Sequence, residues 1–258
     1  MRQLASISIM RITTGMGTAI TTVSGDDGSG DETLFDLLSW MSPAWPIGSF
    51  AFSSGLEWAV QARSVHDRIS VQYWIADLLG HGSLWNDAVI FVHTGRAAMA
   101  GNAGRLAGLV ELAAALLTGA ERRLESTAQG AAYRRIANDV APCRELAMLS
   151  DVADDDLAYP IAAACHLAGH GVDARLALTA LLHAAVANLV SAAQRLVPLG
   201  QTDGQRALHL LRADVLATVS RAVALDDSDP FAAIGSAALF ADFAGFAHET
   251  QYTRLFRT

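Results

Sequence analysis

The sequence predicts an all-α fold, organised as a single domain of about ten helices. Alanine supplies 49 of the 258 residues, and it has the highest intrinsic helix propensity of all residues. Only six prolines interrupt the chain, and apolar residues recur at helical spacing through most of it. About 230 ordered residues are enough to bury a core of their own.

Composition divides the chain into three parts. Residues 1–31 are rich in Ser, Thr and Gly and contain a Gly-Asp stretch near their end, so we expect a disordered N-terminal extension. The helical domain is expected to span 32–248. The remaining residues, 249–258, alternate polar and apolar side chains and are expected to form an extended C-terminal tail, called the tail below.

Hydrophobic periodicity and helix breakers set the order of the helices. The first is expected at 33–40, where Leu34 and Leu38 lie on one apolar face. It ends at 42–48, because two prolines and a glycine in that segment cannot all be helical. The further helices are expected at about 54–60, 68–79, 83–99, 105–118, 121–138, 142–149, 160–168, 173–196, 203–223 and 231–247.

Two of these helices carry further information. In the helix at 121–138, charged residues such as Arg122 and Glu125 indicate a solvated face. The helix at 173–196 contains an uncharged stretch, 176–194, that is long enough to span a bilayer. Much of that stretch is Ala, whereas spanning segments are richer in Leu, Ile, Val and Phe. We therefore expect a helix buried at the centre of the bundle and no membrane span.

Charge and side-chain chemistry exclude several functional classes. All 18 basic residues are Arg, so the Lys of a Walker A loop, of a kinase or of a pyridoxal enzyme is missing. A net charge of −8 argues against nucleic acid as a partner. The two cysteines, Cys143 and Cys165, cannot form a disulfide framework, which favours a reducing, cytoplasmic compartment.

Candidate metal ligands are few. His166 and His170 are four positions apart beside Cys165, which permits two-point ligation, but a zinc site needs two further ligands. A helical metal-dependent enzyme using these two histidines is the alternative functional hypothesis. His248-Glu249 begins like the helical zinc-protease motif, but Tyr252 stands where the second His is required. We assign no catalytic residue, no metal ligand and no cofactor-binding residue.

Aromatic residues are concentrated in two segments. The segment Trp40–Phe52 places four large aromatic residues around two prolines, which indicates either a core plug or a contact surface. The tail contains Tyr252, Arg254 and Phe256, residue types that are common at binding hot spots. It is therefore either a frayed terminus or a segment that becomes ordered on a partner.

These segments resemble the UreF family of urease accessory proteins. The family motif S-P-x-L-P-[IV]-G-x-[FY]-x-[YWF]-S-x-G-L-E is similar to Ser42–Glu57, with Trp45 in place of the usual Leu. A V-P-[LF]-G-Q turn matches Val197–Gln201, and the family's terminal H-E-x-Q-Y-x-R-L-F-R-S matches His248–Thr258. Residues 1–31 lie outside the resemblance.

The resemblance implies an all-helical, cytoplasmic homodimer with no enzyme activity of its own. It implies a chaperone for nickel incorporation into apo-urease that bridges the scaffold accessory protein UreD, also called UreH, and the GTPase UreG. Hydrolysis of GTP would then be coupled to metallocentre assembly. Nickel and GTP would be handled by the partner proteins, so the chain would bind no cofactor stably. Neither nucleic acid nor a membrane is an expected partner.

The resemblance also implies roles for individual positions. Partner-binding positions would be Arg195, Ser236, Ala237, Ala238, Tyr252, Arg254, Leu255 and Phe256. Positions that support the dimer or the motif structure would be Leu34, Leu38, Pro43, Pro46, Gly48, Phe50, Phe52, Ser53, Gly55 and Glu57. The tail would become ordered when it docks on UreD, and the small residues 236–238 would lie on the last helix.

Overall fold

The computed structural model describes residues 28–235 and 237–257, and these residues form an all-helical fold without strands. The predicted fold class is confirmed. Disorder is expected for residues 1–31; of these, 1–27 lie outside the described residues, and the expectation is wrong for 28–31, which form the first turn of α1. The α-helices are α1 (Gly28–Trp40), α2 (Leu56–Gln61), α3 (Arg68–His81), α4 (Ser83–Met99), α5 (Ala103–Leu116), α6 (Ala120–Val140), α7 (Arg144–Ala147), α8 (Tyr159–Gly169), α9 (Ala174–Leu196), α10 (Gln201–Val223) and α11 (Leu239–Glu249). Three short 3-10 turns join them: η1 (Ser49–Ala51), η2 (Asp154–Asp156) and η3 (Pro230–Ala232).

Several helices begin where a side chain satisfies the free backbone amides of the first turn. The carboxylate of Asp67 accepts a hydrogen bond from the Ser70 amide at 2.8 Å, and the Ser70 hydroxyl oxygen accepts one from the Asp67 amide at 3.0 Å. Asp173 caps α9 in the same way through the amides of Arg175 and Leu176. These caps explain why the predicted starts at 68 and 173 agree with the structure to within one residue.

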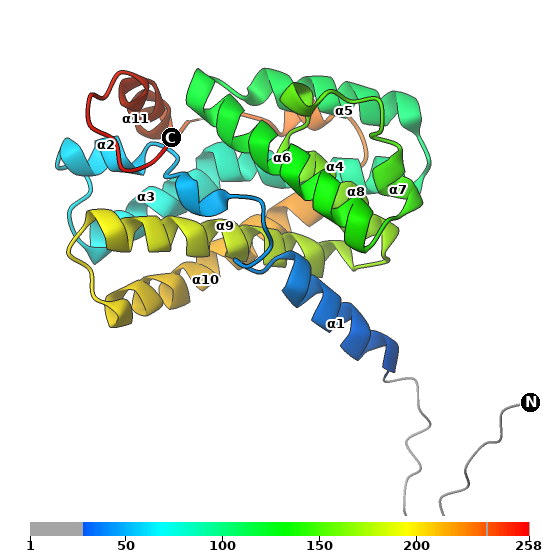
Figure 1. Cartoon of the computed structure of the whole chain (residues 1–258), viewed down its shortest axis with the longest axis horizontal. Helices are drawn as coiled ribbons and strands as arrows, with labels where there is room; N and C mark the ends of the chain where they lie inside the picture. Colours follow the sequence, from blue (N-terminus) through cyan, green and yellow to red (C-terminus); the bar gives the residue numbers. More distant parts are fainter. Residues whose placement is uncertain (1–27, 236, 258) are drawn as a thin grey trace, which may run out of the picture.

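Helix α4 forms the centre of the bundle. It packs against α3, α5, α8, α9 and α10, and twelve of its seventeen residues are buried. Helix α6 crosses over α8 on one side of it, and α9 and α10 lie on the other (Figure 1). The expectation of a buried helix at 176–194 is met in part: α9 packs against α1, α2, α3, α4, α8 and α10, and of these residues only Leu176 and His183 are exposed, but α4 and not α9 forms the centre.

Among the described residues, α9 alone is long and apolar enough to cross a membrane by length and composition. Half of its most apolar window is buried inside the protein. Its buried side includes Leu178, Leu182 and Val186. A core helix of a folded domain meets the same criterion, so the composition of α9 carries no separate argument for a membrane.

Helix α1 begins at Gly28, five residues before the predicted start at Thr33. It projects away from the bundle (Figure 1), and only its last turns contact the body, through the buried Leu37 and Trp40. Leu34 is 48% exposed and Leu38 is 65% exposed. The structure therefore leaves one apolar face of α1 uncovered in the single chain.

The predicted last helix at 231–247 is wrong in its first half. The chain forms η3 and then a non-helical segment before α11 begins at Leu239. The indole of Trp85 donates to the Ala233 carbonyl at 2.9 Å, and the Ala237 amide donates to the His81 carbonyl at 2.9 Å. Bonds to α3 and α4 thus engage backbone groups that a continuous helix would use.

Candidate functional site

The Ser42–Glu57 motif forms a compact loop that leads from α1 into α2. Gly48 and Gly55 have φ values of 77° and 79°, in the left-handed region that a glycine adopts without a steric penalty. Between them, η1 exposes the Phe50 ring, whereas Phe52 and Ser53 are buried. Pro43 and Pro46 lie exposed at the outside of the loop. The motif therefore combines an anchored end with an exposed aromatic end.

Two contacts fasten this motif to the rest of the chain. The side chain of Asn188 on α9 donates to the Ser49 carbonyl at 3.0 Å. A Cβ atom added at Gly55 would lie 2.9 Å from the Gly245 nitrogen, a distance at which something must shift. Only glycine therefore fits at 55, because the backbone of α11 passes directly over it.

Glu57, the last residue of the motif, binds the tail. Its carboxylate is buried and accepts hydrogen bonds from the amides of Leu255, at 2.6 Å, and Phe256, at 2.9 Å. The donors lie almost two hundred positions further along the chain. The first and the last segments of the UreF-like motif set therefore meet at this carboxylate.

The tail differs from the extended segment expected from its alternating pattern. After α11 it turns back toward α2 (Figure 1), and its conformation consists of turns and bends. Arg254 donates to Glu121 of α6 at 2.9 Å and to the backbone carbonyl of Glu249 at 2.8 Å. Alternation is a signal of solvent exposure on one face, but the folded tail does not follow it: the four residues from Tyr252 to Leu255 are all exposed, and Phe256 is buried.

Inward and outward residues of the tail are clearly separated. Phe256 is 4% exposed and belongs to the core, whereas Leu255 is 65% exposed and Tyr252 is fully exposed. The tail is held by contacts within the single chain, without a partner protein. The expected partner-binding set thus divides into Tyr252 and Leu255, which are available to another protein, and Arg254 and Phe256, which act within the chain.

Arg195 joins the motif to the tail. Its guanidinium carbon lies 3.6 Å from the ring centre of Phe50 and 4.2 Å from that of Phe256, and it donates to the Phe50 carbonyl at 3.0 Å. Burial lowers the pKa of Arg195. It lies at the end of α9, just before the Val197–Gln201 turn. All three segments of the resemblance therefore converge on one side of the molecule.

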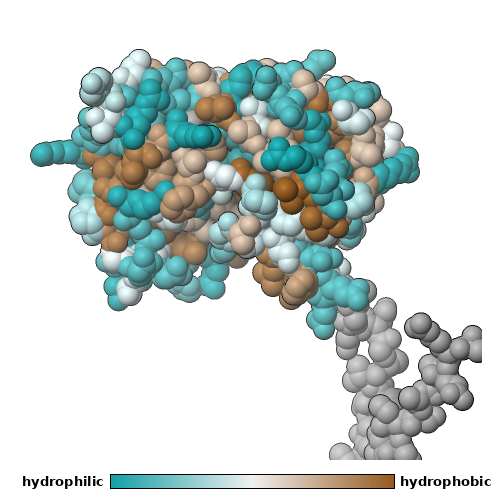
Figure 2. All heavy atoms as spheres, viewed as in Figure 1, coloured by the Kyte–Doolittle hydropathy of each residue, from teal (hydrophilic) through white to brown (hydrophobic). Residues whose placement is uncertain are grey.

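This side presents apolar atoms to solvent. In Figure 2, brown residues gather over the region of α2 and the adjoining part of α9, and again where α1 leaves the body. Helix α11 adds a row of exposed phenylalanines, which consists of Phe240, Phe243 and Phe246. Exposed apolar patches of this kind mark binding surfaces more often than scattered single residues do.

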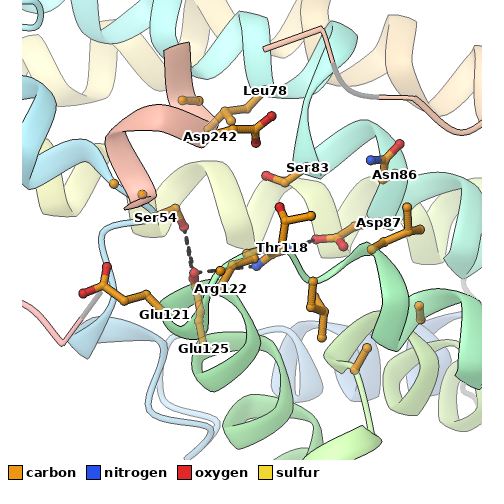
Figure 3. A pocket seen from close by; sticks show the side chains of 18 of the residues that line it. Ser54, Leu78, Ser83, Asn86, Asp87, Thr118, Glu121, Arg122, Glu125 and Asp242 are labelled. Carbon is orange, nitrogen blue, oxygen red and sulfur yellow. Dashed lines mark hydrogen bonds and ion pairs between the residues drawn. The ribbon is translucent and has the colours of Figure 1, made fainter. Parts of the chain in front are cut away.

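Beneath the motif, a buried ion-pair cluster separates two cavities of about 180 and 220 Å³. Figure 3 shows Arg122 between Asp87 and Glu125, with Ser54 on the other side of Glu125. Arg122 lies 2.5 Å from Asp87 and 3.6 Å from Glu125, and the Ser54 hydroxyl donates to Glu125 at 3.0 Å. The side chains of this cluster line both cavities.

Burial and charge act against each other in this cluster. Burial raises the pKa of Glu125, and its contacts with Arg122 and Ser54 offset only part of the effect. Burial by itself would lower the pKa of Arg122, but the charges of Asp87 and Glu125 outweigh it and raise that pKa. The prediction of a solvated face at Arg122 and Glu125 is therefore wrong, because partners from α4 and the motif cover them.

The two histidines of the alternative hypothesis have structural partners. His166 is buried, and its Nδ1 lies 2.9 Å from the Tyr133 hydroxyl while its Nε2 lies 3.0 Å from the Ala141 carbonyl. His170 shares that carbonyl at 3.0 Å. Burial lowers the pKa of His166 to about 4. No group of three or more His, Cys, Asp or Glu that could hold a metal occurs among the described residues.

The small residues at 236–238 have different environments. Ser236 lies outside the described residues. Ala237 is exposed, whereas Ala238 is buried beside Gly82, where a Cβ atom at Gly82 would lie 2.9 Å from that of Ala238. The expectation that Ala238 contacts a partner is therefore not met in this chain, because its methyl group packs against the α3–α4 connection.

Sequence reasoning missed Asp87 and Glu121, which complete the buried ion pairs. Neither lies in a recognisable motif, and their partners are distant: Glu121 meets His248 across 127 positions of sequence. Glu57 was included only through the resemblance. No local pattern signals such pairs, because pairing depends on which helices become neighbours.

Comparison with known proteins shows extensive similarity. A family model described as UreF matches residues 65–212. The urease accessory protein UreF of Rhodopseudomonas palustris strain BisB5 is 46% identical over 228 residues, which is 88% of this chain and 91% of that protein. UreF of Bradyrhizobium sp. strain BTAi1 is 46% identical over 227 residues, with coverages of 87% and 92%. UreF of Bradyrhizobium diazoefficiens is 44% identical over 227 residues, with coverages of 87% and 91%.

Proposed function

Because this chain belongs to the UreF family of urease accessory proteins, we propose that it is a non-enzymatic chaperone for nickel incorporation into apo-urease. In this proposal the chain acts in the cytoplasm and bridges the scaffold protein UreD, or UreH, and the GTPase UreG. Nickel and GTP are bound by the partners, and this chain contributes binding surfaces.

The observation that supports this proposal is the convergence of Phe50, Arg195 and the tail on one apolar side of the molecule. Tyr252 and Leu255 project from the tail, and the exposed phenylalanines of α11 lie beside it. Exposed aromatic residues gathered in one patch favour a protein interface. We propose that UreD binds here and recognises the outward residues of the tail.

We further propose that α1 mediates a homodimer. Its exposed apolar face includes Leu34 and Leu38, and Phe35 on the same helix is 71% exposed. A short groove between α1 and the motif is lined by Phe35, Leu38 and Trp45. A second copy of the helix would cover this surface, and a dimer would display two UreD sites and a shared surface for UreG.

Coupling to GTP hydrolysis requires that this chain bind the GTP and GDP states of UreG with different affinities, since a ligand shifts an equilibrium only by its differential affinity. Titration of UreG in each nucleotide state against the complex of this chain with UreD tests the requirement. Equal affinities in the two states would exclude the coupling.

Urease activity tests the function as a whole. The urease operon is expressed with this chain, without it, and with a variant that carries Tyr252→Ala and Leu255→Ala. We expect nickel-loaded, active urease only with the intact chain, and weak activation with the variant. Full activation without the chain would overturn the proposal.

A further inference from the structure

His248 of α11 lies between two buried carboxylates that belong to different helices. Its Nδ1 is 2.7 Å from Glu121 of α6, and its Nε2 is 3.1 Å from Glu57 of α2. The imidazole ring is fully buried. A neutral imidazole donates from one nitrogen only, whereas an ionised carboxylate only accepts. A ring that donates to both carboxylates therefore carries two protons and a positive charge.

The same two carboxylates hold the tail. Glu57 accepts the amides of Leu255 and Phe256, and Glu121 accepts Arg254. Glu57, Glu121, Arg254 and His248 thus form one closed cluster with the tail amides, called the clasp below. A buried charge without a partner is strongly destabilising, so the clasp is balanced only when His248 is cationic.

The neighbouring carboxylate of Glu249 has a different partner. Glu249 directs its carboxylate to the first amide of α6, at 2.6 Å from the Ala120 nitrogen, where the positive end of the helix dipole favours a negative charge. Only its backbone carbonyl contacts Arg254. The carboxylates that contact the His248 ring are therefore those of Glu57 and Glu121.

We propose that His248 is a positioning residue for the tail. As a buried cation it holds Glu57 and Glu121 ionised and oriented toward the tail, and these carboxylates fix the direction in which Tyr252 and Leu255 project. The clasp is a property of this chain alone, so it can be tested independently of the proposed binding to UreD.

The test measures how firmly the tail is held in the full-length protein. Trypsin cleaves after Arg, and the Arg254–Leu255 bond lies inside the clasp. Hydrogen exchange of the Leu255 and Phe256 amides reports their bonds to Glu57. For His248→Gln we expect both tryptic cleavage at Arg254 and exchange of these amides to become at least tenfold faster. His183→Gln, on the exposed side of α9, is the matched control and leaves both rates unchanged.

A double variant separates charge balance from packing. His248→Gln with Glu121→Gln removes one positive and one negative charge, so Glu57 and Arg254 again balance. We expect the two amides to exchange at least fivefold more slowly in the double variant than in His248→Gln alone. If the ring served only as packing, the second substitution would add to the damage, and equal or faster exchange would overturn the proposal.

The protonation of the ring gives a measurement on the unmodified protein. Nitrogen NMR of the histidine side chains at pH 7 is expected to show both ring nitrogens of His248 protonated. A neutral ring there would overturn the proposal even if the variants failed to fold.

Discussion

The guanidinium carbon of Arg195 lies 3.6 Å from the ring centre of Phe50, and the same carbon lies 4.2 Å from the ring centre of Phe256. One side chain from α9 is thus held between the motif and the tail. An Arg can do this because its planar cation stacks on aromatic faces while its edge donates to a carbonyl.

Replacing this side chain is expected to loosen both segments. For Arg195→Ala we expect the free energy of unfolding to fall by about 1–2 kcal/mol, since a cation–π pair and a hydrogen bond are lost. Urea denaturation measures the change. The control is Arg206→Ala, whose pair with Asp203 is exposed and contributes less than about 1 kcal/mol. Equal losses in the two variants would contradict the stacking role.

The contact between α6 and the segment that leads into α8 allows no side chain at Gly130. A Cβ atom there would lie 2.1 Å from the Leu157 carbonyl oxygen, so Gly130→Ala must displace backbone. We expect a loss of at least about 3 kcal/mol in the free energy of unfolding, or an insoluble protein. Thermal and urea unfolding give the measurement.

Gly108 supplies the opposite case on α5. A Cβ atom there meets nothing within 4 Å, and alanine restricts the unfolded chain more than glycine does. Gly108→Ala is expected to stabilise the protein by about 0.5–1 kcal/mol. Similar changes in the free energy of unfolding for the two variants would show that helix propensity determines the change, and not the approach of the Leu157 carbonyl to Gly130.

The buried ion pairs predict a large loss when only one partner is removed. Arg122→Met leaves Asp87 and Glu125 facing each other without a cation, so we expect the free energy of unfolding to fall by about 3–5 kcal/mol. Arg123→Met removes an Arg whose side chain is 44% exposed and is expected to cost about 1 kcal/mol or less. Chemical denaturation at pH 7 compares them, and an equal cost would rule out the buried cluster.

His166 predicts how stability changes with pH. Burial lowers its pKa to about 4 in the folded chain from the ordinary histidine value of 6.5, so the unfolded state binds the proton more tightly. Stability is therefore full above pH 6.5 and falls as the pH is lowered toward 4. By pH 5 this histidine should contribute a loss of about 2 kcal/mol.

A His166→Gln variant should lose that part of the pH dependence, although it is less stable at pH 7. Denaturation at pH 7 and pH 5 gives the two values for each protein. His183→Gln serves as the exposed control and should keep the full dependence. An unchanged dependence in His166→Gln would assign the effect to other groups.

The division of the tail into two faces predicts two kinds of variant. Tyr252→Ala and Leu255→Ala should leave the free energy of unfolding within about 0.5 kcal/mol and weaken binding to UreD by about 1–3 kcal/mol each. Phe256→Ala should cost about 3–5 kcal/mol of stability, because its ring is buried. Calorimetric titration with UreD and urea denaturation separate the two classes. Normal UreD binding by the Tyr252 and Leu255 variants would exclude this face as the docking site.

Most helices could be predicted because their signals are local. The Asp67–Ser70 capping box and Pro160 in the first turn of α8 fix helix starts through neighbouring atoms. The segment before α11 could not be predicted, since its backbone bonds to Trp85 and His81 far away in sequence.

The candidate site was predictable in part. The motif residues and the tail are visible in sequence, but their inward and outward orientation is not. Whether Arg122 is solvated or buried depends on Asp87 of α4, and whether the tail is free or folded depends on Glu57. The burial of Arg122 and the folding of the tail are both set by packing between residues distant in sequence, and such packing produces no periodic pattern in the sequence.

The bonds from Glu57 to the Leu255 and Phe256 amides also have a consequence for synthesis. The two sides of the contact are separated by almost two hundred residues, so the proposed docking face is incomplete until Leu255 and Phe256 have left the ribosome. A nascent chain that has not reached these residues folds its helices but lacks that face. Only molecules synthesised as far as Phe256 would then present the docking face for assembly.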